Sequence, residues 1–286
     1  MEGLSKLKEV VKDPQTLMFE VRKKRKDVIF WGAAVFLTLL AFWFFSSGDY
    51  SFLIVLSSTI QMLSFLIILI KVYSYQNCSG LSLNTLKSYG ILLFARLTST
   101  LFYNGYLPSD KAGDWFYQLT EIISLISVCL LIFLVTNTFK DTSNLYDDQI
   151  DFKYLSIPTI LLALLVHTSL NRNFFTDVMW TFSMYLEAVA VYPQIYLFQK
   201  KGGQIESYTS HYVALQGLSR LFSLLFWYDT YPELNESLDD SFSLFHSYCG
   251  YFIILSQLIQ LIIMIDYYYL YFKGLFKGEK MIINDI

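Results

Sequence analysis

Long apolar runs, separated only by short polar stretches, constrain the fold of this chain more than any other feature. About 20 apolar residues in an α-helix cross the roughly 30 Å hydrocarbon core of a bilayer. Eight runs reach or approach that length, at about 28–46, 52–73, 84–104, 115–136, 154–169, 176–198, 209–228 and 245–272. Charged residues make up 16% of the 286 residues, against about 25% in soluble domains. The sequence therefore predicts a polytopic helical membrane protein embedded in the lipid bilayer.

The distribution of Lys and Arg predicts how these spans are oriented. Of the 21 basic residues, 17 fall on one side of an alternating eight-span arrangement, two on the other side and two inside spans. Cytosolic loops carry the excess of Lys and Arg, so both termini are expected in the cytosol. We read the first run as an uncleaved anchor. The expected domains are a basic tail with an extra transmembrane helix (1–50), a seven-helix domain (51–280) and a C-terminal tail (281–286).

A short motif occurs twice in the chain. The sequence RLTSTLF at 96–102 recurs as RLFSLLF at 220–226, displaced by 124 residues and with five identities. Four spans separate the copies, so both enter the membrane in the same orientation and form a parallel repeat. Such repeats build SWEET/PQ-loop-like folds with a site at the repeat interface. We therefore expect two parallel triple-helix units joined by a linker helix at 154–169.

Five ionisable side chains fall inside the predicted spans: Arg96, Glu121, Glu187, Arg220 and Asp266. An ionised group in the membrane is costly unless it is paired or hydrated, and it marks a functional site by default. Two positive and three negative groups permit near-complete internal pairing. A purely structural role, in which buried pairs lock the helices together, is the alternative.

Three of the predicted helices each carry a stripe of polar side chains that also includes an aromatic residue. The stripes are Arg96-Ser99-Tyr103, Arg220-Ser223-Trp227 and Asp177-Trp180-Met184-Glu187. Helical spacing places the members of each stripe on one face, and we expect the stripes to converge on a polar cavity open to the lumen. An arginine in such a cavity holds a carboxylate through two parallel hydrogen bonds. The expected ligand is a small anion or the C-terminus of a peptide.

Other classes of site have no support in the sequence. CxxC, HExxH, Walker and GxGxxG patterns do not occur, so neither a metal nor another cofactor is expected. Because no nucleophile, base and orienting acid can be assembled from the spans, we do not expect an enzyme. A net charge of −3 and the lack of a basic face with interleaved aromatic residues give nucleic acid no surface to bind.

Four segments resemble the KDEL receptors, a family that retains luminal proteins in the endoplasmic reticulum. They are MWTFSMYLEAVAVYPQ at 179–194, CSGLS at 78–82, TSHY at 209–212 and DYYYLY at 266–271. The resemblance extends over about residues 52–280 and implies a paired triple-helix fold. It also implies a function, because such receptors bind the C-terminal Lys/His-Asp-Glu-Leu of escaped proteins in the acidic Golgi and return them in coated vesicles.

The resemblance also implies roles for individual residues. The positions that match ligand-binding residues of the family are Arg96, which would hold the carboxylate, Asp177, Trp180 and Trp227. Those that match the family's internal polar network are Glu187, Arg220 and Asp266. Six other ligand positions differ from the family: Ile54, Gln61, Ser99, Ser219, Ser223 and Thr230. Two of the three pocket arginines are thereby absent, and each would contribute contacts worth about 1.5–3 kcal/mol.

The leading hypothesis is a diverged retrieval receptor of the endoplasmic reticulum and Golgi, with C-terminal peptides of luminal proteins as ligands. By resemblance, vesicle coat proteins would contact the cytosolic lysines Lys273, Lys277 and Lys280. The alternative is an accessory subunit of a larger membrane complex, which kept the fold, lost the ligand and docks through the extra helix and the acidic 229–240 loop. A small-molecule transporter is a third reading, and a mitochondrial or other organelle membrane stays open.

Overall fold

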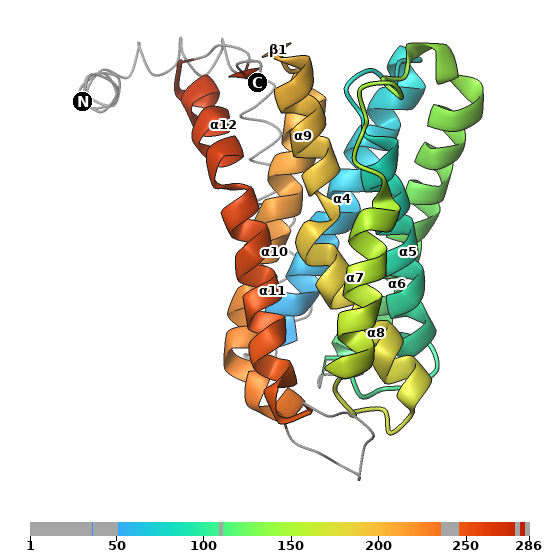
Figure 1. Ribbon diagram of the computed structural model, residues 1–286, viewed down its shortest axis with the longest axis vertical. Helices are drawn as coiled ribbons and strands as arrows, with labels where there is room; N and C mark the ends of the chain where they lie inside the picture. Colours follow the sequence, from blue (N-terminus) through green and yellow to red (C-terminus); the bar gives the residue numbers. More distant parts are fainter. Residues whose placement is uncertain (1–35, 37–50, 109–110, 236–245, 278–280, 284–286) are drawn as a thin grey trace.

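The computed structural model describes residues 36, 51–108, 111–235, 246–277 and 281–283, which form a bundle of helices (Figure 1). The helices are α4 (Ser51–Tyr75), α5 (Leu83–Thr100), α6 (Lys111–Phe133), η1 (Leu134–Thr138), η2 (Lys140–Thr142), α7 (Phe152–Leu165), α8 (Phe174–Ala190), α9 (Tyr192–Lys201), α10 (Ser207–Asn235), η3 (His246–Tyr248), α11 (Cys249–Ile263) and α12 (Ile265–Lys277). Two short strands, β1 (Gly203–Gln204) and β2 (Ile282–Ile283), pair antiparallel. The prediction of an all-α membrane protein is confirmed.

The expected spans from residue 52 onward correspond to these helices, whereas the expected first span, 28–46, lies outside the described residues apart from Phe36. Among the described helices, Ser51–Tyr75 and Asp114–Thr138 qualify as membrane spans on length and composition alone, with mean hydropathies of 2.4 and 2.5. The bent pair α11–α12 qualifies when it is counted as one span. Helices α5 and α8 carry the polar stripes, which lower their mean hydropathy.

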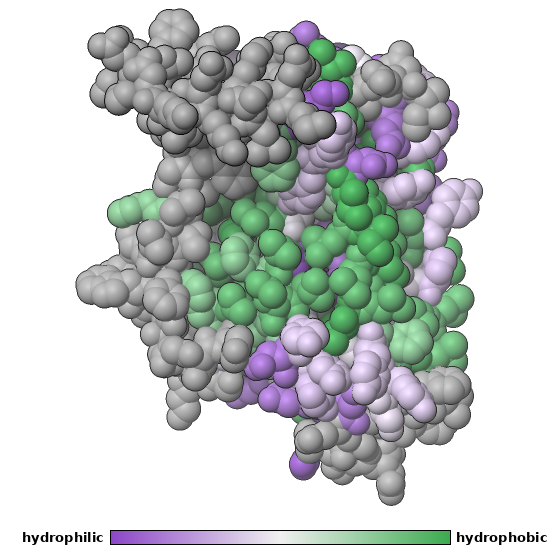
Figure 2. Space-filling model, turned by 90° about the vertical axis from the view of Figure 1, so that its left-hand side faces the viewer, coloured by the Kyte–Doolittle hydropathy of each residue, from purple (hydrophilic) through white to green (hydrophobic). Residues whose placement is uncertain are grey.

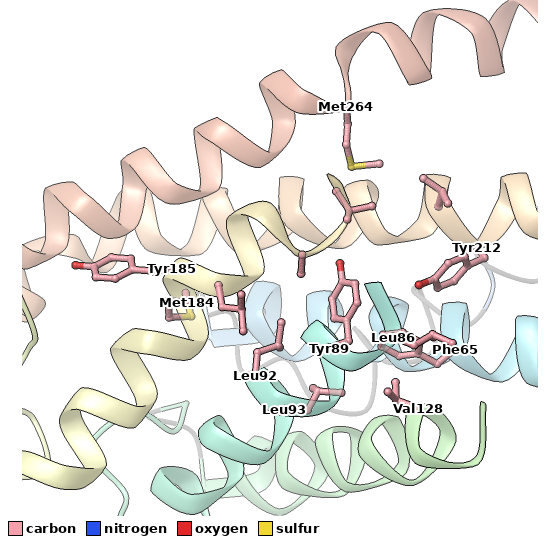
Figure 3. Close-up of a cluster of buried hydrophobic side chains, with 14 of the residues drawn as sticks. Phe65, Leu86, Tyr89, Leu92, Leu93, Val128, Met184, Tyr185, Tyr212 and Met264 are labelled. Carbon is pink, nitrogen blue, oxygen red and sulfur yellow. The ribbon is translucent and has the colours of Figure 1, made fainter. Parts of the chain in front are cut away.

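Two of the expected spans are interrupted. The span at 176–198 divides into α8 and α9, because Pro193 at the start of α9 has no amide hydrogen to continue the helical ladder. The last span divides at Met264 into α11 and α12, which are inclined by 45°. Figure 3 shows the Met264 side chain turned from this break toward the interior, where Tyr89 and Tyr212 lie. The prediction that each of these two spans is one continuous helix is wrong.

The helix contacts follow the predicted parallel repeat. In the first unit α6 packs against both α4 and α5, and in the second unit α11 packs against both α8 and α10. The two units meet where α4 packs against α10 and α5 packs against α8. Helix α5 begins at Leu83 and α10 at Ser207, the same 124-residue displacement as the motif. Helix α7 packs against α8 and α5 and links the two units.

The ends of the bundle serve as landmarks for the site. We call the end at the bottom of Figure 1, where α8 begins and α10 ends, the lower end, and the opposite end the upper end. At the upper end, Gln194 accepts a hydrogen bond from the Ser82 amide at 2.9 Å and donates one to the Gly80 carbonyl at 2.7 Å. Burial raises the pKa of the nearby Cys78 thiol, so this side chain is an inert neutral thiol.

The bundle has an apolar interior and an apolar belt. Aromatic rings pack inside it, as where Phe65 and Tyr89 meet edge to face at 5.1 Å (Figure 3). In Figure 2 apolar side chains form a band across the middle of the surface, with hydrophilic residues above and below it. Exposed side chains such as Ile126, Leu161 and Ile262 are unfavourable in water and favourable in lipid. The surface is therefore that of an integral membrane protein.

Gly250, at the start of α11, lies against the end of α10. Its amide donates to Asn235 Oδ1 at 2.8 Å, and a Cβ atom there would lie 2.3 Å from the Tyr231 carbonyl oxygen. We expect Gly250→Ala to lower the free energy of unfolding by about 1–3 kcal/mol, because overpacking forces the two backbones apart. The measurement is thermal melting of the protein in detergent.

Gly90 on α5 is the matched control for this change. A Cβ atom there would meet only side-chain atoms of α6, at 3.5 and 3.7 Å, which is ordinary van der Waals contact. Because alanine also has the higher helix propensity, Gly90→Ala should leave the melting temperature unchanged or raise it. Equal losses in the two variants would contradict the close approach of α10 and α11.

Candidate ligand-binding site

At the centre of the bundle two arginines share one carboxylate. Arg96 of α5 and Arg220 of α10 occupy equivalent positions in the repeat, and both pair with Glu187 of α8. Arg220 Nη1 lies 2.5 Å from Glu187 Oε2, and Arg96 Nη2 donates to the same oxygen. Arg96, Arg220 and Glu187 are only 3%, 2% and 0% exposed. The two repeat units are therefore joined through a buried ionic centre.

Two further side chains complete this charged cluster. Gln61 of α4 donates from Nε2 to Glu187 Oε1 at 2.7 Å. Glu121 of α6 accepts a hydrogen bond from Arg96 Nη1 at 3.2 Å. The two arginines and two glutamates balance in charge, which is the condition under which ionised groups are tolerated in the membrane interior.

A cavity of about 10 Å³ lies beside the cluster. Its lining includes Arg96, Arg220, Met184, Trp180 and Trp227. A space of this volume holds about one water molecule. The three polar stripes therefore converge as predicted, but the expectation of a cavity open to the lumen is wrong for this conformation, because aromatic side chains fill the space.

Several polar atoms on the cavity wall lack a hydrogen-bond partner within the part of the chain that the structure describes. They are Trp227 Nε1, Ser223 Oγ, Glu121 Oε2 and Gln61 Oε1. An unpaired buried polar group costs about 1–3 kcal/mol, so most buried groups have partners. The cavity thus has unused donors and acceptors for a polar ligand or a water molecule.

An aromatic layer closes the cavity toward the lower end. The ring of Tyr106 stacks on Trp180 with centroids 4.0 Å apart and planes inclined by 7°. Trp227 meets Trp180 edge to face, with centroids 5.3 Å apart. The Tyr106 hydroxyl donates to Asp177 Oδ1 at 2.5 Å, which fixes the ring over Trp180.

Asp177 also anchors the loop between α7 and α8. Its two carboxylate oxygens accept the backbone amides of Asn171 and Asn173, each at 3.1 Å. The loop then reaches α5 and the turn that follows it, because Asn171 Nδ2 donates to Ser99 Oγ at 2.6 Å and Asn173 Nδ2 donates to the Tyr103 hydroxyl at 3.1 Å. Donors of the chain itself therefore occupy both oxygens of Asp177.

The structure brings most of the predicted ligand-binding residues together. Arg96, Trp180 and Trp227 line one cavity, although they come from three different helices. Asp177 lies outside this cavity lining, one layer nearer the lower end, and connects to it through Tyr106.

The expected network of Glu187, Arg220 and Asp266 needs a correction. Glu187 and Arg220 pair, but Asp266 is exposed in the first turn of α12, beyond the break that separates this helix from α11. The cluster contains Gln61 and Glu121 in place of the predicted Asp266. The break turns the start of α12 away from the cluster.

The six positions at which the resemblance implies a difference from the family lie in or near the same region. Three of them line the cavity: Ile54, Gln61 and Ser223. Ser219 accepts a hydrogen bond from Arg220 Nη2 at 2.8 Å, and Ser99 is the residue bonded by the α7–α8 loop. Thr230 donates to a carbonyl oxygen of its own helix. Arg96 and Arg220 are kept, and Ile54, Gln61, Ser219 and Ser223 lie close to them.

Sequence reasoning missed one member of the site, Tyr106, and named a second, Gln61, only as a ligand position that differs from the family. Tyr106 lies in the connection after α5, where no helical periodicity marks which side chains turn inward. Gln61 is uncharged, so it was not among the ionisable groups that marked the membrane interior. Glu121 was marked in that way but was given no place in the site.

A larger hollow of about 520 Å³ lies elsewhere, between α10, α11 and α12. Its described lining is apolar apart from the Tyr268 hydroxyl, and includes Leu218, Leu261 and Phe272. The hollow presents no charge or hydrogen-bonding group suited to a peptide terminus. The small polar cavity, lined by Arg96 and Arg220, is the better candidate for such a site.

Comparison with known proteins identifies the family. Residues 77–230 match the family model described as ER lumen protein retaining receptor. The chain belongs to this family. ER lumen protein-retaining receptor 3 of Mus musculus is 26% identical over 227 residues, which are 79% of this chain and 95% of that protein. The ER lumen protein-retaining receptor of Entamoeba histolytica is 28% identical over 224 residues, 78% of this chain and 94% of that protein.

The segment matched by the ER lumen receptor family contains most of the site. It includes Arg96, Glu121, Glu187 and Arg220, whereas Gln61 precedes it. The protein is accordingly an integral membrane protein of a receptor family rather than of an enzyme family.

Proposed function

We propose that this chain is a receptor that binds the C-terminal carboxylate of luminal proteins through Arg96 and returns them from the Golgi to the endoplasmic reticulum. The observation that carries the proposal is the place of Arg96, at the junction of the two repeat units and on one cavity with Trp180 and Trp227. Folds with paired repeats bind their ligands at such an interface. The unpartnered Trp227 Nε1 and Ser223 Oγ supply donors for the ligand.

In this proposal the described conformation is the ligand-free one. A peptide reaches Arg96 when Tyr106 leaves the face of Trp180 and the α7–α8 loop releases Ser99. The lower end then faces the lumen and both termini lie in the cytosol, in keeping with the excess of Lys and Arg on the opposite side. Asp177 acts in this scheme by holding the loop that closes the site.

The return step of the proposal involves the upper end of the bundle. Lys273 is exposed on α12, and Lys277 and Lys280 follow it in the sequence. These three lysines are proposed to contact vesicle coat proteins, as the resemblance to the family implies.

A peptide-binding measurement tests the proposal. Purified full-length protein is expected to bind a fluorescent peptide ending in His-Asp-Glu-Leu or Lys-Asp-Glu-Leu more tightly than its C-terminally amidated form, by about tenfold or more, because one charge-assisted hydrogen bond is worth about 1.5–3 kcal/mol. Anisotropy is recorded at acidic and at neutral pH. Arg96→Ala should abolish the binding of the free carboxylate, whereas Lys140→Ala, at an exposed upper-end lysine, should not change it.

A second variant keeps the test decisive if Arg96→Ala does not fold. Trp227→Phe keeps the aromatic ring but removes the unpartnered Nε1 donor, so it should weaken binding while the protein still elutes as a single species. If neither peptide binds at either pH, the receptor proposal is refuted for these signals.

The accessory-subunit function is the second candidate, and two observations favour it. The cavity holds about one water molecule, and the charges of the buried cluster already balance. A subunit without a ligand would copurify with a larger membrane complex at fixed stoichiometry after mild solubilisation. It would also show no change in melting temperature with any C-terminal peptide.

A further inference from the structure

Glu121 is an acidic side chain inside the site that is proposed to bind the carboxylate of a ligand. It is 1% exposed on α6, and its Oε1 accepts from Arg96 Nη1 at 3.2 Å. Its second oxygen, Oε2, has no partner among the described residues and belongs to the lining of the polar cavity. A carboxylate of the protein itself therefore lies against the arginine that is proposed to bind the carboxylate of the ligand.

Every side-chain nitrogen of Arg96 already has a partner among the described residues, and two carboxylates hold its terminal nitrogens. Nη2 donates to Glu187, Nη1 donates to Glu121, and Nε lies 3.4 Å from Ser183 Oγ. A ligand carboxylate that forms a bidentate pair with Arg96, the geometry that arginine favours, competes with the two glutamates for these terminal nitrogens.

The two glutamates are held to different extents. Glu187 pairs with Arg96 and Arg220 and also accepts from Gln61. The side chain of Glu121 makes one hydrogen bond within the described residues, to Arg96. Displacement of Glu121 thus breaks one contact, whereas displacement of Glu187 breaks three.

We infer that Glu121 is a specificity-determining residue, an internal carboxylate that occupies the ligand position on Arg96 and selects against acidic peptides. The inference rests on the proposed function and deepens it by naming the ligand class. A ligand carboxylate that displaces Glu121 takes its place on Arg96, and Glu121 then stays in the site as a carboxylate without its arginine partner. Any additional acidic side chain meets the charge of Glu121, and the described cluster holds no third cation to offset it. The preferred ligands are C-terminal peptides with a free carboxylate and uncharged preceding side chains.

A peptide series tests this selectivity. The wild-type protein is expected to bind a peptide ending in Asn-Gln-Leu more tightly than the matched peptide ending in Asp-Glu-Leu. Glu121→Gln should raise the affinity for the acidic peptide by about tenfold, which corresponds to about 1.4 kcal/mol. Glu121→Asp keeps the charge and should keep the wild-type preference. Ser124→Ala is the matched control, because Ser124 lies on the same helix and its hydroxyl bonds only to the carbonyl of Thr120 within the described residues.

A second measurement tests Glu121 without any peptide. Sodium formate supplies a carboxylate alone, with sodium chloride at equal concentration as the control for ionic strength. Formate should raise the melting temperature of Glu121→Gln and leave that of the wild type unchanged, because only the variant has an arginine nitrogen without its carboxylate. Equal effects of formate on both proteins overturn the inference, as does an unchanged order of peptide affinities in Glu121→Gln.

The two measurements separate the two claims. A response of Glu121→Gln to formate, together with no binding of any peptide by any variant, supports the role of Glu121 on Arg96 and refutes the receptor proposal. Tight binding of the acidic peptide by the wild type, with no gain in Glu121→Gln, supports the receptor and overturns the role of Glu121.

Discussion

Replacement of Glu187 by Gln is expected to cause the largest loss of stability of any single change considered, about 3–5 kcal/mol. Glu187 is the only carboxylate that contacts both Arg96 and Arg220 within the described residues. Glutamine keeps the size of the side chain but removes its charge, which leaves two buried arginines with Glu121 as the single counter-ion. Removal of one partner from a buried ion pair leaves the desolvation cost of the other partner uncompensated.

Thermal melting and gel filtration in detergent measure this effect. The control is Glu233→Gln, the same chemical change at an exposed position near the end of α10, where we expect a change within about 0.5 kcal/mol. A double variant, Glu187→Gln with Arg220→Gln, restores the balance of charge and should recover part of the loss. Similar melting temperatures for Glu187→Gln and the wild type would show that the ion pairs do not hold the repeat units together.

The overall architecture could be predicted because the sequence repeats itself. The apolar runs give the approximate positions of the described helices, and the motif at 96–102 and 220–226 gives their pairing. Helical spacing was sufficient to bring Arg96, Trp180 and Trp227 to one cavity. Apolar runs and helical spacing are properties of single helices, and the repeat can be read directly from the sequence.

The failures concern places where helices end or break. Asp266 shares its apolar run with α11, so the sequence gives no sign that the helix turns by 45° just before it. Tyr106 lies in a connection, and its position depends on a hydrogen bond to Asp177, which is 71 residues distant in the sequence. Such features are determined by tertiary contacts, which helical periodicity does not report.

The closed state of the cavity could not be predicted for a related reason. Each stripe on its own predicts a polar helix surface. How much of the cavity the aromatic side chains fill depends on how the helices pack against one another. Tyr106 and Trp180 stack with centroids 4.0 Å apart, although Tyr106 lies in a connection and Trp180 in α8. Glu121 adds a carboxylate whose partner, Arg96, lies on the neighbouring helix.

Replacement of Asp177 by Asn is the change with the second-largest expected effect. Asp177 accepts three hydrogen bonds, from the Tyr106 hydroxyl and from the amides of Asn171 and Asn173. Asparagine keeps one acceptor oxygen and places an NH₂ group opposite a donor. Because hydrogen bonds to a charged group contribute about 1.5–3 kcal/mol each, we expect the α7–α8 loop to lose about 3 kcal/mol of local stability. Hydrogen exchange of the backbone amides at residues 168–173 measures this loss.

Tyr106→Phe serves as the matched control because it removes one of the three hydrogen bonds and keeps the ring that stacks on Trp180. Tyr106→Phe should increase amide exchange less than Asp177→Asn does, because the Asn171 and Asn173 amides still bond to Asp177. The change in exchange should be confined to residues of the aromatic layer. Faster exchange of the loop in Asp177→Asn would show that the Asp177 carboxylate holds the α7–α8 loop in place. Unchanged exchange in Asp177→Asn would contradict the role of the Asp177 carboxylate in holding the α7–α8 loop.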